Sequence, residues 1–372
     1  MKIQMNPVGS SGDMQLDQVL SADAWSLDDD ASLRMEFIRR SLVHHIEKCL
    51  PYREFAERCG FRPRDLRAPE DMINVPQFPA MAFKTVRTLM SCSPEAVAKR
   101  CTSSGTMGRI SEVMRDQLTI DRMLSSIRWG TELLGHWNDD DVAVLNLGPN
   151  QEEAGDLWFA YVSTLLETFY STSHMVRNGR FNVHQVGDVL NDLEERYPVV
   201  LLLGPPPLVL SVLRSLDGER SEPRDSTFVI TAGGWKRSTG EMVDRSDFDS
   251  LACSALNLAH NRQVRDVFNQ VELNTVLVEC AHHYKHVPPW LEVIVRDPYT
   301  LDPVTGDKEG LLSYLDPTAY SYPCFFIGED FGRLDTVECD CGRVGRRLFV
   351  TRRVKRDEDW GCARKMDRDY GG

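Results

Sequence analysis

The sequence lacks the long apolar stretch that a membrane-spanning helix would need. Its most apolar run, Val199–Leu203, is followed by Gly204 and three prolines, and it is far too short to cross a bilayer. The N-terminus has no apolar run behind its charged residues, so it does not resemble a secretory leader. We therefore predict a cytoplasmic protein without a membrane span.

The sequence has fewer basic than acidic residues, 43 against 56, and a formal net charge of −13. This imbalance argues against nucleic acid or an anionic membrane as a general partner, although a local site can still be basic. Internal repeats and low-complexity tracts are absent as well. The 372 residues are thus available for a large core with two or more subdomains, and the ten cysteines are predicted to be reduced thiols.

Strand and helix patterns alternate through the middle of the chain. Buried strands are predicted near residues 141–147, 199–203 and 226–232, with helices over 116–134, 152–170, 181–197 and 207–216. This alternation predicts an α/β fold whose sheets are covered by helices. Beyond about residue 270, short strands separated by turns predict a smaller, more antiparallel subdomain.

The same patterns suggest how the chain is divided. Residues 1–85 form a helical N-terminal segment and a connector, in which a helix over 29–59 ends or bends at Pro51. Residues 86–345 form the core, with the β-rich subdomain at about 275–345. Residues 346–372 form a hinge and a charged C-terminal arm.

A loop of hydroxyl residues and glycines, Thr102-Ser-Ser-Gly-Thr-Met-Gly108, is the first candidate binding element. Its backbone N–H groups and hydroxyls can turn inward to surround a polyphosphate. It is not a Walker loop, because no Gly-Lys-Ser/Thr follows the second glycine. The alternative is an ordinary turn-rich loop without a ligand.

Two carboxylates are candidates for contacts with a nucleotide. Glu272 follows the aromatic residue Phe268 by four positions, so the ring could lie on a purine while the carboxylate ligates Mg²⁺. Asp330 follows an apolar strand, where it can accept hydrogen bonds from both ribose hydroxyls. The alternatives are an exposed acid at a strand end and a turn aspartate that caps its own backbone.

Three cysteines and a histidine have the composition of a tetrahedral zinc site: Cys280, His286, Cys339 and Cys341. The histidines at 282 and 283 are competing ligands. Four protein ligands leave no open position, so a zinc ion here would be structural rather than catalytic. The alternative is a set of unrelated buried thiols and a polar histidine.

Cys362 lies near the C-terminus in a basic setting. The neighbouring residues Arg364, Lys365 and Arg368 would favour the thiolate, which is the nucleophilic form of cysteine. The alternative is a terminal cysteine without a role.

Taken in order, these stretches resemble the adenylate-forming ligases, and among them the acyl-protein synthetases (LuxE type) of bacterial luminescence. Phenylacetate–CoA ligases are more distant relatives. The resemblance covers roughly residues 75–365. It rests on Val75-Pro-Gln-Phe-Pro-Ala-Met-Ala-Phe-Lys84, the loop 102–108, Thr231-Ala-Gly-Gly-Trp-Lys236, Arg265-Asp-Val-Phe-Asn-Gln-Val-Glu-Leu-Asn274, His283-Tyr-Lys-His-Val-Pro-Pro-Trp290, Ser321-Tyr-Pro, Glu329-Asp330, Cys339-Asp-Cys-Gly-Arg343 and Gly361-Cys-Ala-Arg-Lys-Met-Asp367.

This resemblance implies the N-terminal domain of an adenylate-forming ligase, with layered mixed sheets and a β-rich subdomain. The implied ligands of ATP are Thr102, Ser103, Ser104, Gly105, Thr106, Gly108, Gly233, Gly234, Phe268, Asn269, Gln270, Asp330 and Arg352, or its neighbour Arg353. Glu272 would hold Mg²⁺. Some phenylacetate–CoA ligase relatives carry zinc on ligands like those found here, and in the acyl-protein synthetases a cysteine in the place of Cys362 accepts the acyl group.

The sequence departs from the superfamily pattern at three places. Arg109-Ile110 replaces the usual Pro-Lys after the loop, and Phe-Asn-Gln-Val-Glu272 replaces Tyr-Gly-x-Thr-Glu. The usual C-terminal domain is expected to be missing, and with it the lysine that assists adenylation. Lys365 is a candidate substitute for that lysine.

The resemblance implies an ATP-dependent ligase that activates a carboxylic acid, with a fatty acid favoured, as an acyl-adenylate. Cys362 would then take the acyl group and pass it to a partner, an acyl reductase or a carrier protein. One alternative is an enzyme that hands an aryl or other biosynthetic acyl-adenylate directly to a reductase, carrier protein or amine. Another is a zinc-containing scaffold without catalytic activity.

Overall fold

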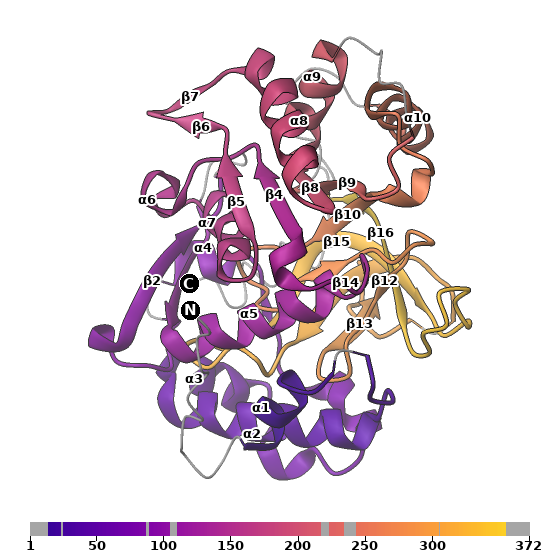
Figure 1. Cartoon of the computed structure of the whole chain (residues 1–372). Coiled ribbons are helices and arrows are strands. Elements are labelled where there is room, and N and C mark those ends of the chain that lie inside the picture. Colours follow the sequence, from indigo (N-terminus) through magenta and orange to yellow (C-terminus); the bar gives the residue numbers. More distant parts are fainter. Residues whose placement is uncertain are drawn as a thin grey trace.

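The computed structural model describes residues 14–23, 25–86, 89–104, 110–216, 223–233, 243–304 and 306–354, and Figure 1 shows their arrangement. The α-helices are α1 Met14–Leu20, α2 Ala31–Lys48, α3 Leu50–Arg58, α4 Ala82–Thr85, α5 Gln117–Thr131, α6 Gln151–Ala154, α7 Trp158–Thr164, α8 Val186–Arg196, α9 Pro206–Ser215 and α10 Arg245–Leu256. The strands are β1 Phe78–Pro79, β2 Val97–Thr102, β3 Glu112–Asp116, β4 Val142–Asn146, β5 Ser171–His174, β6 Val176–Arg177, β7 Arg180–Phe181, β8 Val199–Gly204, β9 Thr227–Ala232, β10 Val264–Phe268, β11 Leu277–Val278, β12 Lys285–His286, β13 Glu292–Arg296, β14 Gly310–Leu315, β15 Phe325–Asp335 and β16 Arg347–Arg353.

The first large sheet has the order β11-β10-β9-β8-β4-β5 and is parallel except for β11. Successive residues of its central strands pack on opposite faces. In β4, Val142 and Val144 belong to one apolar cluster, while Ala143 and Leu145 belong to a second cluster that includes side chains of α8, α9 and α10. A parallel sheet needs this cover on both faces, which explains why β8 is apolar at nearly every position.

The second large sheet is antiparallel over the order β12-β16-β15-β14-β13, and the short strand β1 adds to β15 in parallel. It lies beside the first sheet in Figure 1, where its strands β12 to β16 run from orange to yellow. The structure thus has an antiparallel layer in the region beyond residue 270. Residues 347–353, which the sequence suggested as a hinge, continue this sheet as β16.

The N-terminal helices show how local sequence sets element ends. The Asp30 side chain accepts hydrogen bonds from two backbone N–H groups at the start of α2, and that helix ends at Cys49. Pro51 lies in the first turn of α3, so the predicted break at this proline is confirmed. The single helix predicted over 152–170 is wrong, because Gly155 takes a φ of 55° and separates α6 from α7.

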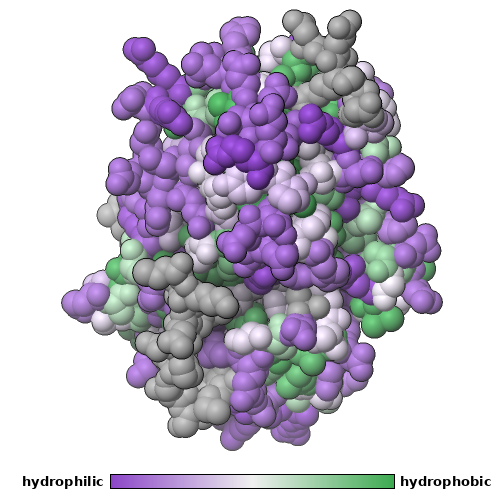
Figure 2. All heavy atoms as spheres, viewed as in Figure 1, coloured by the Kyte–Doolittle hydropathy of each residue, from purple (hydrophilic) through white to green (hydrophobic). Residues whose placement is uncertain are grey.

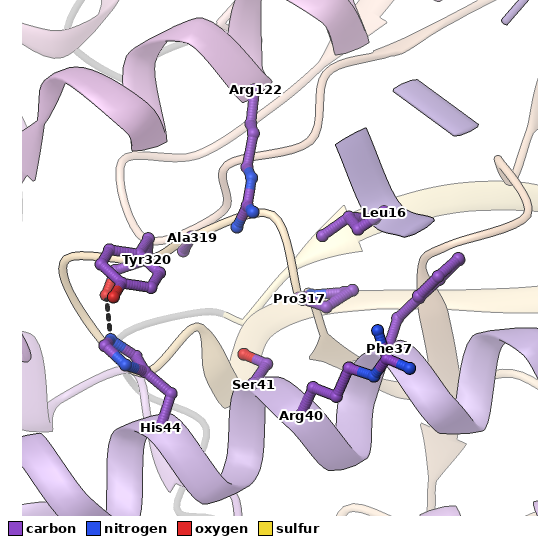
Figure 3. A pocket seen from close by; sticks show the side chains of 9 residues that line it. All are labelled: Leu16, Phe37, Arg40, Ser41, His44, Arg122, Pro317, Ala319 and Tyr320. Atoms are coloured by element: carbon purple, nitrogen blue, oxygen red, sulfur yellow. Dashed lines mark hydrogen bonds between the residues drawn. The ribbon is translucent and has the colours of Figure 1, made fainter. Parts of the chain in front are cut away.

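The described surface has few large apolar features. The face in Figure 2 is mostly hydrophilic, with apolar residues in scattered groups. Figure 3 shows a hollow between α1, α2, α5 and the 317–320 loop, where His44 Nε2 donates a hydrogen bond to the Tyr320 carbonyl oxygen at 2.9 Å. None of the helices in the described ranges is long and apolar enough to cross a membrane.

Candidate functional site

The β2–β3 hairpin carries the hydroxyl-glycine loop, residues 102–108. Hydrogen bonds join the two sides of this loop at its neck, which is formed by residues 102–103 and 111. The Ser103 N–H donates to the Ser111 carbonyl at 3.0 Å, and the Ser111 N–H donates to Ser103 Oγ at 2.9 Å. The Thr102 N–H donates to the Asp156 carbonyl at 2.7 Å, which ties the hairpin to the segment before α7. Ser104 is exposed at the mouth, whereas Gly105, Thr106 and Gly108 lie outside the described residues.

Three carboxylates converge next to this neck. Burial raises the pKa of Glu272, the nearby Ser111 side chain acts to lower it, and the charge of Glu329 adds to the rise. Burial and the charges of Glu329 and Glu272 raise the pKa of Asp330 to about 6, although Arg353 opposes them. Close carboxylates in a partly dry site repel one another, and this repulsion favours a bound cation.

Two cations face this carboxylate cluster. The Glu329 carboxylate accepts from Lys84 Nζ at 2.7 Å on one oxygen and from Arg353 Nη2 at 2.8 Å on the other. Burial acts to raise the pKa of Glu329, but these two ion pairs hold it below its usual value. Glu329 is thus ionised at neutral pH.

In the segment after β10, Asn269 is fully hydrogen-bonded, whereas the amide nitrogen of Gln270 has no hydrogen-bond partner among the described residues. Asn269 accepts from Trp158 Nε1 at 2.6 Å and donates both amide hydrogens to backbone carbonyls of 273 and 275, so it holds the loop in shape. Gln270 Nε2 and the Tyr314 hydroxyl are buried without a hydrogen-bond partner among the described residues. Phe268 lies 6.4 Å from the Tyr314 ring, centroid to centroid. A bound ligand could supply the acceptors that these buried donors lack.

The end of β9 places Gly233 opposite an aromatic ring. Its φ of 88° is unfavourable for other residues, and a Cβ there would lie 3.2 Å from Phe159 Cδ2. A larger side chain would therefore disturb both the turn and the ring. Gly234 lies outside the described residues.

The two arginines at the end of β16 lie in different surroundings. Arg353 pairs with Asp330 in the sheet register and binds Glu329, whereas Arg352 stacks over the Phe331 ring at 3.9 Å and lies near Glu309. Of the two residues that sequence reasoning offered, the structure brings Arg353 to the carboxylates. Sequence reasoning gave no role to Lys84, Glu329 and Ser111, although the first two lie in stretches that carry the family resemblance.

The predicted metal ligands come together at the far end of the second sheet. The ligand atoms of Cys280, His286, Cys339 and Cys341 all lie within 4.8 Å of one another. The sulfurs of Cys280 and Cys339 are 3.8 Å apart, and Cys341 Sγ lies 3.2 Å from His286 Nε2. Zn–S bonds of about 2.3 Å and Zn–N bonds of about 2.0 Å in a tetrahedron give edges of about 3.8 Å and about 3.6 Å.

The chemistry of this Cys/His cluster also suits a metal ion. Burial and two nearby arginines lower the pKa of His286 to about 4, so its ring is neutral and can ligate. Burial raises the pKa of the Cys280 thiol to about 12, a cost that a bound cation would remove. The competing histidines are turned elsewhere, since His283 Nδ1 lies 2.8 Å from Arg245 Nη2 and His282 lies beside Asp340.

A buried ion network lies directly under the Cys/His cluster. Lys285 Nζ contacts Glu279 Oε1 at 3.0 Å and Asp266 Oδ2 at 2.9 Å. Glu279 also binds Arg245, and its carboxylate accepts from the Asp266 N–H at 2.9 Å. Glu279 and Lys285 are the chain neighbours of Cys280 and His286. Through their contacts with Asp266, the network therefore holds the Cys/His cluster against β10.

The fold is that of the adenylate-forming ligases. A 2-hydroxyisobutyryl-CoA ligase crystallised in an open conformation with 2-HIB-AMP and CoA aligns with 87% of this chain and 74% of its own, at a TM-score of 0.67 and 14% identity. A long-chain-fatty-acid-CoA ligase from Archaeoglobus fulgidus aligns with 75% of this chain and 55% of its own, at a TM-score of 0.50 and 15% identity. The predicted fold class is confirmed.

The chain belongs to the acyl-protein synthetase family, LuxE, which matches residues 1–371. It is 34% identical over 348 residues to the long-chain-fatty-acid–luciferin-component ligase of Vibrio harveyi, covering 93% of this chain and 90% of the relative. The corresponding ligase of Aliivibrio fischeri is 31% identical over 344 residues, with 92% and 90% covered. The predicted family and the prediction of an AMP-forming acyl ligase are confirmed.

Cys362 and Lys365 lie outside the described residues. The structure therefore leaves their predicted roles as predictions.

Proposed function

We propose that this ligase activates a long-chain fatty acid with ATP and then carries the acyl group on Cys362. The relatives named above support this substrate, since their names specify a long-chain fatty acid. The single observation that carries the proposal is the convergence of Glu272, Asp330 and Arg353 beside the neck of the hydroxyl-glycine loop.

In the first step, a carboxylate oxygen of the acid attacks the α-phosphorus of ATP. A P–O bond forms, the bond to the β-phosphate breaks, and pyrophosphate leaves with the electron pair. Glu272 would hold the Mg²⁺ that screens phosphate charge, the residues at 102–108 would donate to the phosphates, and Asp330 would accept from the ribose. Gln270 Nε2 offers a buried donor for the nucleotide on the other side of the site.

In the second step, the Cys362 thiolate attacks the acyl carbonyl of the adenylate. The C–S bond forms, the C–O bond to AMP breaks, and AMP leaves as the phosphate monoester. The resulting thioester would pass its acyl group to a partner enzyme, for which an acyl reductase is the chemical class we propose. A carrier protein is the alternative acceptor.

Pyrophosphate exchange tests the first step. With Mg²⁺ and a series of fatty and aromatic acids, exchange into ATP should be fastest with a long-chain fatty acid. An absence of exchange with every acid would contradict the proposal and favour the scaffold function. Fastest exchange with an aryl acid would keep the adenylation and replace the substrate.

Cys362→Ser tests the second step. The variant should keep pyrophosphate exchange and lose the covalent acyl label that mass spectrometry of the intact protein detects. Cys59→Ser is the matched control, since Cys59 is an exposed thiol in the N-terminal segment. A Cys362→Ser variant that still carries the acyl group would exclude the role, and direct transfer of the adenylate would then be the better account.

We also propose that the Cys/His cluster holds a structural zinc ion. The observations that support it are the near-tetrahedral edges and the neutral, buried His286. All four positions of the metal would be filled by Cys280, His286, Cys339 and Cys341, so the ion would stabilise the fold and take no part in the acyl transfer. Elemental analysis of the purified protein should give one zinc per chain.

A further inference from the structure

The cation of the carboxylate cluster that sequence reasoning left without a role is Lys84. It follows β1, which pairs with β15 through Phe78 and Phe326, and the Ala80 N–H donates to the Ile327 carbonyl at 2.9 Å. This pairing carries the short helix α4 across the end of β15. This arrangement brings the Lys84 side chain, which is only 7% exposed, into an ion pair with Glu329.

Lys84 has more donors than the protein uses. A lysine ammonium carries three N–H donors. Within the described ranges, its one hydrogen bond goes to Glu329 Oε1 at 2.7 Å. The other Glu329 oxygen is already bound by Arg353, so the charge of this carboxylate has a cation without Lys84. A buried ammonium with unused donors needs a further acceptor.

The described base of the loop at 102–108 lies near the same carboxylates. The Lys84 charge and the nearby Ser111 side chain both act to lower the pKa of Glu272. Ser111 in turn closes the loop neck through Ser103. Lys84, the proposed Mg²⁺ ligand Glu272 and the base of the phosphate loop are thus close enough to influence one another electrostatically.

We propose that Lys84 binds a phosphate oxygen of the nucleotide, held ready for it by the Glu329 carboxylate. The inference rests on the proposed ATP-dependent adenylation and names one more ligand of the same site. In the ligand-free protein the ammonium lies on Glu329. With MgATP bound, its two remaining N–H donors reach the triphosphate while the bond to Glu329 keeps the side chain in place.

Calorimetric titration of MgATP separates this role from a purely structural ion pair. Lys84→Met should weaken MgATP binding by about 10- to 100-fold, the loss expected for hydrogen bonds to a charged group, and Lys84→Arg should recover most of it. Glu329→Gln keeps the ammonium and should change the dissociation constant by less than about threefold, since a neutral amide can still accept from it. Lys48→Met, at an exposed lysine in the last turn of α2, removes the same charge and should have no effect.

The Lys84→Met/Glu329→Gln double variant removes both charges of the pair, so it folds without an uncompensated buried charge. It should show the full loss of affinity, and pyrophosphate exchange should show it as a raised KM for ATP. Equal losses in Lys84→Met and Glu329→Gln would mean a structural pair, and wild-type affinity in the folded double variant would also overturn the proposal. A wild-type protein that neither binds MgATP nor exchanges pyrophosphate would instead overturn the proposed function.

Discussion

Lys84 and Lys285, two lysines with buried side chains, lie in two regions that are built differently. Lys285, beside the Cys/His cluster, contacts both Asp266 and Glu279, whereas Lys84, in the proposed nucleotide site, forms its one ion pair among the described residues with Glu329. Beside the Cys/His cluster, the Lys285 charge is matched by two carboxylates, although Arg265 Nε and Nη1 have no hydrogen-bond partner among the described residues. Among the described residues, the proposed nucleotide site has donors without acceptors on Lys84 and Gln270, and three carboxylates that repel one another. One region stabilises the fold, and the other keeps binding capacity for a ligand at the expense of stability.

The largest effect should come from removing a ligand of the Cys/His cluster. Cys339→Ser should lose the bound zinc and a large part of the roughly 10 kcal/mol that structural zinc contributes to folding in small domains. Loss of zinc by elemental analysis and a much lower Tm are the expected results. Cys253→Ser, at a half-buried thiol on α10, should retain both zinc and Tm. A Cys339→Ser protein with unchanged Tm would show that the Cys/His cluster does not stabilise the fold.

Lys285→Met should have the next largest effect. The change leaves Asp266 without its buried cation and removes one of the cations on Glu279, so we expect a loss of about 3 kcal/mol in the free energy of unfolding. Lys84→Met should cost about 1 kcal/mol, because Glu329 is partly exposed and keeps Arg353. Urea unfolding of both variants without nucleotide measures the difference. Equal losses would remove the contrast between the two regions.

Asp330→Asn should stabilise the ligand-free protein while it weakens nucleotide binding. The pKa of Asp330 is about 6 in the folded chain against 3.8 for the ordinary group, so the unfolded chain ionises first as the pH rises. The wild-type protein therefore loses stability between about pH 4 and pH 6, and the variant does not. We expect Asp330→Asn to be more stable by about 1–3 kcal/mol at pH 7 and by about 1 kcal/mol less at pH 5.

Urea unfolding at the two pH values checks this expectation, and MgATP titration checks the cost in binding. Asp335→Asn is the control, since Arg347 binds that carboxylate and holds its pKa below the usual value against the effect of burial. The control should lose stability rather than gain it. An Asp330→Asn protein less stable than wild type at pH 7 would mean that Asp330 is part of the folding interactions.

Arg352→Gln should have the smallest effect. Its pair with Glu309 spans 3.8 Å and is partly exposed, so its loss should cost less than about 0.5 kcal/mol and leave the KM for ATP unchanged. Arg353→Gln should raise that KM, because Arg353 faces Asp330 and Glu329. Steady-state kinetics of the two variants shows which of the two neighbouring arginines affects the KM for ATP. A raised KM in Arg352→Gln alone would reverse the assignment.

Much of the architecture follows from local sequence. The apolar run at 199–203 became the central strand β8, and the break at Pro51 separates α2 from α3. The prediction of helices failed where a single residue changed the backbone path, as Gly155 does between α6 and α7. The four residues of the Cys/His cluster were also predictable as a set, because cysteine and histidine in this combination have few other shared uses.

The amino-acid sequence by itself determined the α/β class, the family and the identity of the metal-cluster residues, since these depend on hydrophobic pattern and on scarce residue types. Only the tertiary structure decided that Arg353 rather than Arg352 meets the carboxylates. A register shift between Phe331 and Gly332 in the β15–β16 pair sets which arginine lies opposite Asp330. The tertiary structure also decided that Lys84 contacts Glu329, 245 residues further along the chain, because β1 pairs with β15. Such contacts depend on strand pairing over long distances, and no local pattern encodes them.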